Sequence, residues 1–303
     1  KSAGRVQSVA LRIISERELE IEKFNPQEYW SIQGDFINKQ DKLINSRLTL
    51  YDGNKVEKLD IKNEEQATSI YTTIKNSKFK VGSIIKKEAK RNPYAAFTTS
   101  TMQIESSRKL GLSASQTMRT AQKLYEGTEI KGETTGLITY MRTDSVVMSN
   151  DAISKIRNFV NENYGAEYLP ESPRVYKSKA KNAQEAHECI RPTNINLTPK
   201  NIKQFITAEE YKLYEIIWQR AVSSQMSSAI LDQVAVDIVS EDEKISMRAN
   251  GSTIKFLGMY RVYREAKDDD IDEEKETILP VVNEGEVLHL KEINKNQHFT
   301  LPP

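Results

Sequence analysis

The sequence is poor in cysteine and contains no long apolar run, and each shortage excludes a class of protein. Cys189 is the single cysteine in 303 residues, so these residues form neither an internal disulfide nor a cysteine-rich zinc site. Such usage fits a reducing cytoplasm. Every purely apolar run is far shorter than the roughly 20 residues that span a bilayer, and no signal peptide is visible. We therefore expect a cytoplasmic globular protein without a membrane partner.

A strong net charge is missing as well, because 44 lysines and arginines face 43 acidic residues. The charges are nevertheless unevenly placed, with a basic run on either side of Tyr140. The runs consist of Lys86, Lys87, Lys90, Arg91, Arg108, Lys109, Arg119 and Lys123, and of Arg174, Lys177, Lys179 and Lys181. Acidic residues crowd instead into 265–276, which is typical of a solvated loop, with metal binding as the less favoured alternative.

The hydrophobic period predicts a first part made mostly of strands. Apolar residues of the opening stretch recur at helical spacing, after which Trp30, Ile32 and Phe36 alternate with polar residues. The expected elements are a helix ending near Phe24, a strand through Trp30–Phe36, a hairpin at Asp52-Gly53 with its second strand over 55–59, a helix over 64–74 and a strand over 79–85.

A helical part follows, and strands return after it. We expect helices over 100–110, 113–125, 150–164 and 208–226, the last carrying an aromatic set that we interpret as core rather than as a base-stacking surface. The economical interpretation is an α+β chain in which a helical domain is inserted into a β-rich one. The expected domains are 1–27 as part of a larger unit, 28–92 with 229–298, 93–228, and 299–303 as the start of another.

Tyr140 and Arg142 form the first candidate site. A phenol has an ordinary pKa near ~10 and attacks poorly unless the cost of its anion is lowered, whereas an arginine fork binds two phosphate oxygens and offsets developing charge. Strand-prone residues surround Tyr140, and in an extended chain residues i and i+2 share a face. The pair therefore suggests a tyrosine that attacks phosphate. Alone the pattern is weak, and a half-buried tyrosine beside a solvated arginine explains it equally.

A second candidate site lies in Asn182–Thr193. His187 is suited to donate to a phosphate or to move a proton near neutral pH, and Arg191 adds a second cation before Pro192. A single histidine beside an acid is more often structural, so this segment by itself leaves both interpretations open.

Four separated segments resemble, nearly residue for residue, the type IA DNA topoisomerases of the bacterial topoisomerase I kind. They are Ser2–Ala10, Phe97–Gln103, Gly136–Ser145 and Asn182–Thr193. The most specific is Gly136–Ser145, and the similarity spans essentially the whole chain. The resemblance implies a multidomain α+β arch whose inserted helical domain carries the catalytic tyrosine, as in the gate of those enzymes.

The resemblance also implies roles for single residues. Tyr140 matches the tyrosine that attacks a phosphodiester of single-stranded DNA and becomes joined to the 5′ phosphate, and Arg142 matches the arginine that holds that phosphate. His187 matches a histidine close to the site. Arg5 and Gln7 match DNA contacts of the strand-binding helix. The implied activity is ATP-independent isomerisation of DNA, in which cleavage, strand passage and resealing relax negative supercoils.

Other features depart from the family pattern. The N-terminal Toprim domain, which supplies a glutamate acid, a lysine and the aspartates that bind Mg²⁺, precedes nothing here, since the sequence begins on Lys1. It also stops at Phe299–Pro303, just ahead of another family segment, and Cys189 stands where alanine is more usual. We therefore expect a piece of a longer protein, with its Mg²⁺ site outside these residues, that is inactive alone.

Three other functions compete with this interpretation. The piece is alternatively a non-catalytic module that binds single-stranded DNA through basic helices and stacking tyrosines. A tyrosine recombinase or type IB enzyme, which joins to the 3′ phosphate, fits poorly because its set of arginines around the nucleophile is missing. A protein-interaction scaffold leaves the segments around Arg5, Tyr140 and His187 unexplained together.

Overall fold

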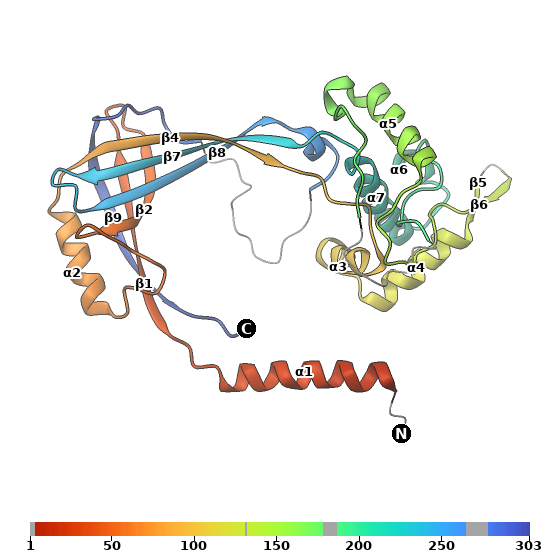
Figure 1. Cartoon of the computed structure of the whole chain (residues 1–303), viewed down its shortest axis with the longest axis horizontal. Coiled ribbons are helices and arrows are strands. Elements are labelled where there is room, and N and C mark those ends of the chain that lie inside the picture. Colours follow the sequence, from red (N-terminus) through yellow and green to blue (C-terminus); the bar gives the residue numbers. More distant parts are fainter. Residues whose placement is uncertain (1–3, 131, 178–186, 265–277) are drawn as a thin grey trace. The chain divides into compact units, whose positions relative to one another are not determined.

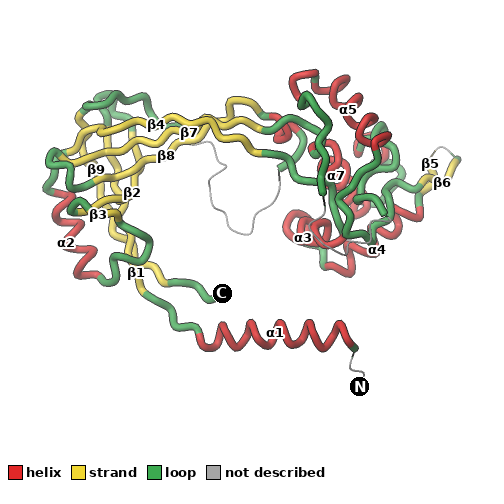
Figure 2. Tube along the Cα trace, in the orientation of Figure 1, coloured by secondary structure: helices red, strands yellow, loops and turns green. Residues whose placement is uncertain are grey.

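The computed structural model describes residues 4–130, 132–177, 187–264 and 278–303, and the chain divides into two compact units (Figure 1). Unit 1 comprises 1–87, 233–252 and 277–303, whereas unit 2 comprises 88–232 and 253–276. Each unit is therefore assembled from segments that are distant in the sequence. Antiparallel strands dominate unit 1 and helices dominate unit 2 (Figure 2), which confirms the expected α+β class.

The strands form one main sheet with the order β1-β9-β4-β7-β8-β2-β3, and an additional pairing of β1 with β2 closes it into a ring. The bounds are β1 Glu28–Ile37, β2 Leu43–Tyr51, β3 Asn54–Lys55, β4 Phe79–Arg91, β7 Ala229–Ser240, β8 Ser246–Phe256 and β9 Val287–Phe299. In β1, Trp30, Ile32 and Phe36 are buried, as their alternation predicts. Helix α2 (Glu64–Lys75) adds Ala67 and Ile74 to the same core.

The expected hairpin at Asp52-Gly53 is confirmed, but its second strand is shorter than predicted. Both turn residues have positive φ, 49° and 76°, which matches the right-handed twist of a two-residue hairpin. Strand β3 ends at Lys55 because the chain turns back on itself, and the Asp60 carboxylate accepts the backbone N–H of Glu57 at 2.7 Å. Local turn chemistry therefore overrides the strand pattern there.

Unit 2 is built around helix α7, which spans Ala208–Ser223. The other elements are α3 Thr99–Leu110, α4 Ala114–Glu126, α5 Asn150–Tyr164, α6 Pro199–Ile202, the 3₁₀ turns Ala166–Tyr168 and Gly258–Arg261, and a small hairpin of β5 Thr128–Ile130 and β6 Glu133–Thr135. Capping boxes at Thr98, Ser113 and Thr207 begin α3, α4 and α7. Tyr214 and Trp218 are buried, which confirms that the aromatic set of α7 is core.

Helix α1 (Arg5–Lys23) has the predicted bounds, but none of its residues is buried. Its large apolar residues are all exposed: Val6, Val9, Leu11, Ile13, Ile14, Leu19 and Ile21. Ion pairs between Arg12 and Glu16 and between Arg17 and Glu20 lie along its surface. In the part of the chain that the structure describes, α1 and the other helices are each too short or too polar to cross a membrane.

Candidate functional site

Tyr140 lies half-buried against the core of unit 2, between two other aromatic rings. Its ring centroid is 5.5 Å from that of Tyr125, in an edge-on contact, and 5.0 Å from that of His187. Among the described residues, no group forms a hydrogen bond with the Tyr140 hydroxyl. The ring is therefore fixed by packing, whereas its oxygen has no protein partner there.

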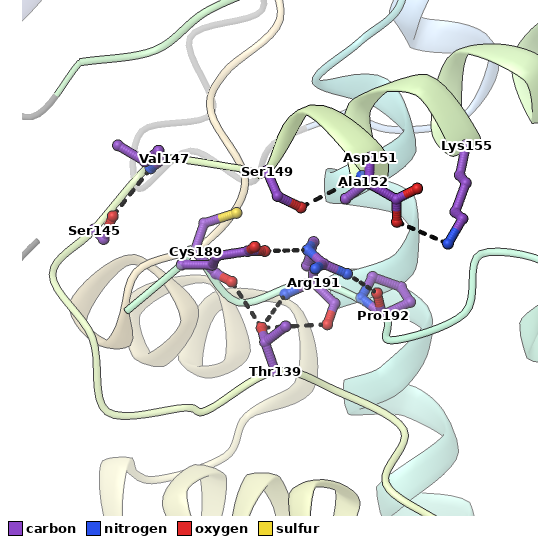
Figure 3. A network of polar contacts seen from close by, with 11 residues as sticks. Thr139, Ser145, Val147, Ser149, Asp151, Ala152, Lys155, Cys189, Arg191 and Pro192 are labelled. Carbon is purple, nitrogen blue, oxygen red and sulfur yellow. Dashed lines mark hydrogen bonds and ion pairs between the residues drawn. The ribbon is translucent and has the colours of Figure 1, made fainter. Parts of the chain in front are cut away.

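The segment carrying Tyr140 is bound on one side to residues 189–193 (Figure 3). Thr139 is the central contact: its backbone N–H donates to the Arg191 carbonyl at 2.9 Å, and its hydroxyl donates to the Cys189 carbonyl at 2.7 Å. The same hydroxyl accepts the backbone N–H of Arg191 at 3.0 Å. Ile138 and Pro192 form an isolated β-bridge. The residue before the candidate nucleophile is thus held through both backbone and side chain.

On its other side the segment meets the start of helix α3. The backbone N–H of Thr99 donates to the Thr143 carbonyl at 2.9 Å, and the Thr99 hydroxyl donates to the Met141 carbonyl at 2.8 Å. Phe97 and Ile190 pair in a second isolated bridge. Three of the four segments that carry the family resemblance therefore meet around Tyr140.

Helix α4 supports the segment through a close backbone approach at Gly136. The neighbouring Leu137 N–H donates to the Leu124 carbonyl at 2.7 Å. A Cβ on Gly136 would lie 2.8 Å from the carbonyl oxygen of Tyr125, closer than real Cβ contacts. Only glycine fits this approach without displacing α4 or the segment.

The strand expected through Tyr140 does not form. Strand β6 ends at Thr135, and bends occur at Thr139, Met141 and Arg142, because the segment bonds to two different partners in turn. Burial nevertheless alternates, with Met141 buried between the partly exposed Tyr140 and the exposed Arg142. Among the described residues no carboxylate pairs with Arg142. Its guanidinium is thus available to an anion.

Arg191 is engaged within the protein rather than turned to solvent. Its Nε donates to the Glu188 carboxylate at 2.6 Å and its Nη1 to the Pro192 carbonyl at 2.9 Å, and 15% of its side chain is exposed. Burial acts to raise the pKa of Glu188, but hydrogen bonds and attraction from Arg191 and hydrogen bonds from Ser149 outweigh it and lower that pKa. Glu188 is therefore a carboxylate at neutral pH.

The structure brings together some of the predicted site residues and not others. Tyr140, Arg142, His187 and Arg191 all belong to unit 2, whereas Arg5 and Gln7 are exposed on α1 in unit 1. The acidic run 265–276 and residues 182–186 lie outside the described residues.

Sequence reasoning missed several neighbours of Tyr140. Tyr125 is 41% exposed at the end of α4, and Thr99, Thr139 and Glu188 supply most of the polar contacts. Their one visible signal is that Thr99, Thr139 and Glu188 fall inside the segments that carry the resemblance.

A phenol with an unpartnered hydroxyl beside an exposed guanidinium is suited to phosphoryl transfer, in which positioning and charge stabilisation supply most of the catalysis. The described residues contain no group of three or more histidine, cysteine, aspartate or glutamate side chains placed to hold a metal ion. They therefore do not fit a magnesium site.

Comparison with known proteins gives consistent matches over the whole chain. The family model described as DNA topoisomerase matches residues 1–303. A protein named DNA topoisomerase 1 from Rickettsia bellii is 53% identical over 303 residues, covering 100% of this chain and 38% of that protein. Its counterpart from Xylella fastidiosa is 45% identical over 310 residues, again covering 100% and 38%.

A solved structure agrees with these sequence matches. Full-length topoisomerase I from Thermotoga maritima matches with a TM-score of 0.78 at 30% identity, covering 100% of this chain and 46% of that one. The chain thus spans less than half the length of the relatives that it matches.

Proposed function

This chain belongs to the DNA topoisomerase family, and from that premise we propose that it carries the strand-cleaving tyrosine of a type IA enzyme. The parent activity is ATP-independent relaxation of negative supercoils, with single-stranded DNA as the strand that is cut. The observation that carries the proposal is the geometry of Tyr140: a ring fixed by packing and flanked by three converging segments, with a hydroxyl that has no partner among the described residues.

The proposed reaction is a reversible transfer of one phosphodiester. The Tyr140 oxygen attacks phosphorus, the bond from phosphorus to the 3′ oxygen breaks, and a 5′ phosphotyrosine forms. The phenol loses its proton, and the departing 3′ oxygen gains one. Because a phosphotyrosine ester stores roughly the energy of the bond that it replaces, the 3′ hydroxyl reverses the attack without ATP.

Arg142 and His187 serve this step from opposite sides of Tyr140 in our proposal. The exposed Arg142 fork binds the scissile phosphate and offsets its developing charge. His187, whose ring contacts that of Tyr140, lies close enough to donate to the same phosphate.

Other cations hold the DNA strand rather than the reacting phosphorus. Arg5 and Gln7 on α1 contact the DNA strand, as the family resemblance implies. A DNA contact by Arg191 requires its fork to share or leave the Glu188 carboxylate. Arg191 is therefore the most conditional of the proposed DNA contacts.

We place the magnesium and the general acid in a Toprim domain outside these residues. The absence of a fitting ligand cluster among the described residues supports that placement. Because protonation of the leaving group and its positioning are each worth orders of magnitude in rate, the chain alone is proposed to be inactive. The cytoplasmic location stays a proposal that rests on cysteine usage.

A complementation assay tests the function. The chain is mixed with a separately produced Toprim-containing remainder of the parent, magnesium and a labelled single-stranded oligonucleotide, and covalent adduct is scored on denaturing gels. We expect an adduct that needs both pieces and is lost in Tyr140→Phe. Tyr125→Phe is the matched control, because it removes a hydroxyl from the neighbouring ring. If the two pieces associate and bind DNA without forming an adduct, a non-catalytic binding module is the better function.

A further inference from the structure

Glu188 joins the segment beside Tyr140 to the beginning of helix α5. Its carboxylate accepts Arg191 Nε at 2.6 Å and also accepts the backbone N–H and the hydroxyl of Ser149. Ser149 is the N-cap of α5, and its oxygen also accepts the Ala152 N–H (Figure 3). Negative charge at a helix N-terminus is favourable, so this carboxylate is held by a helix end as well as by a cation.

The helix that holds Glu188 is itself fixed. Ile153, Ile156 and Val160 of α5 are buried in unit 2. Immediately after Glu188, the Cys189 N–H donates to the Val147 carbonyl at 2.8 Å, just before α5. Residues 188 and 189 are thereby tied to the start of α5 by a side chain and by the backbone.

His187 depends on this anchor for its place. Its imidazole is exposed and forms no hydrogen bond with any described residue, so its contact with Tyr140 is one of ring packing. An exposed side chain without a polar partner keeps one orientation only if its backbone is fixed. The nearest fixing contact in the described chain is the carboxylate of Glu188, one residue away.

We propose that Glu188 is a positioning residue, which clamps its backbone between Ser149 and Arg191 and so holds the His187 imidazole against Tyr140. This inference rests on the proposed function for its meaning, because it supplies the step with a preset donor beside the nucleophile. Glu188 itself does not transfer a proton, since its oxygens are directed to Arg191 and Ser149.

The test reads the ring contact directly, by proton NMR of the His187 imidazole in the whole chain. The sequence has three histidines, so the signals of His289 and His298 serve as internal references, and a His187→Asn variant assigns the third. Tyr140→Leu defines the shift of His187 without the tyrosine ring. We expect Glu188→Gln to move the His187 signal most of the way to that value and to weaken its cross-peaks to Tyr140.

The matched control is Asp237→Asn in unit 1. Asp237 also pairs with an arginine, accepting Arg248 Nε at 2.6 Å, so its removal costs a comparable ion pair but leaves the clamp intact. The His187 signal is expected to stay in place in this variant. If Glu188→Gln fails to fold, Glu188→Asp, which keeps the charge on a shorter arm, is expected to give a partial displacement.

An unchanged His187 signal in a folded Glu188 variant overturns the inference, whatever the enzyme activity. Conversely, a displaced His187 in a chain whose Tyr140 forms no adduct leaves the positioning contact standing and removes the proposed function. In the complementation assay we expect Glu188→Gln to slow adduct formation without abolishing it, and Asp237→Asn to leave the rate unchanged.

Discussion

Helix α1 and the segment around Tyr140 are both predicted to contact DNA, yet they are stabilised in opposite ways. Helix α1 is regular over 19 residues and has no buried residue. The Tyr140 segment has no regular secondary structure beyond a bridge at Ile138, but hydrogen bonds to residues 99, 189 and 191 hold it, and Leu137 and Ile138 are fully buried.

The difference shows that regularity and rigidity are separate properties. An isolated helix of this length is marginal in water, and its stability normally comes from packing of an amphipathic face. The Tyr140 segment obtains its order from tertiary contacts instead, which suits a nucleophile whose attack depends on positions fixed within fractions of an ångström. The following predictions test this contrast, from the largest expected effect to the smallest.

The same substitution is expected to act very differently in the two regions. Ile217→Ala in α7 removes a fully buried side chain beneath the site and should cost about 2–5 kcal/mol of unfolding free energy. Ile13→Ala in α1, where the side chain is 61% exposed, should cost less than about 0.5 kcal/mol.

Urea unfolding measures both in a Trp30→Phe background. Each unit holds one of the two tryptophans, so Trp218 fluorescence then reports unit 2 alone. Equal losses in the two variants would contradict the contrast between the regions.

Arg142→Ala is expected to slow adduct formation in the complementation assay by about 10²–10³-fold, the usual cost of losing one preorganised donor in phosphoryl or acyl transfer. Arg142→Lys should recover only part of the rate, because an ammonium lacks the two-pronged fork. The melting temperature should hardly change, since the guanidinium is exposed and unpaired among the described residues. A rate unaffected by Arg142→Ala would remove this residue from the site.

The local elements of unit 2 could be predicted from the sequence. Helices α3, α4 and α5 begin at residues whose side chains cap them, and their apolar residues recur at helical spacing, so both signals are local. The hairpin at Asp52-Gly53 is local for the same reason.

The surroundings of Tyr140 could not be predicted in this way. Strand propensity around Thr139 favours an extended chain, but the backbone bends to bond with Thr99 on one side and Arg191 on the other, contacts 40 to 52 residues away that no local pattern encodes. Arg191 shows the same limit, because the ion pair with Glu188 that engages its fork appears only in three dimensions.

Arg5→Ala on α1 should weaken binding of single-stranded DNA modestly, by about tenfold or less, and uniformly across sequences. It should also reduce the slope of log affinity against log salt by about 0.7, the value for one phosphate contact on a single strand. Glu16→Gln, a substitution on the same exposed helix, is the control and should not reduce the slope. An unchanged slope in Arg5→Ala would remove the DNA contact proposed for this residue.

The smallest effect concerns pH and the Glu188 ion pair. Because the pKa of Glu188 is lowered in the folded protein, its contribution to stability is complete above the ordinary glutamate value of 4.5 and is lost as the pH falls through the folded value. The stability difference between the wild type and Glu188→Gln should therefore be constant near neutral pH and shrink in acid. Unfolding curves at a series of pH values measure it, and a difference that grows in acid would contradict the assigned direction.

The most direct test of the central claim is the polarity of the covalent bond at Tyr140. The complementation assay is run with oligonucleotides labelled at either the 3′ or the 5′ end, and the linked peptide is mapped by mass spectrometry. The account predicts that the 3′-labelled fragment stays on the peptide containing Tyr140, while the 5′-labelled fragment is released with a free 3′ hydroxyl. Retention of the 5′-labelled fragment, or attachment at Tyr125, would contradict it.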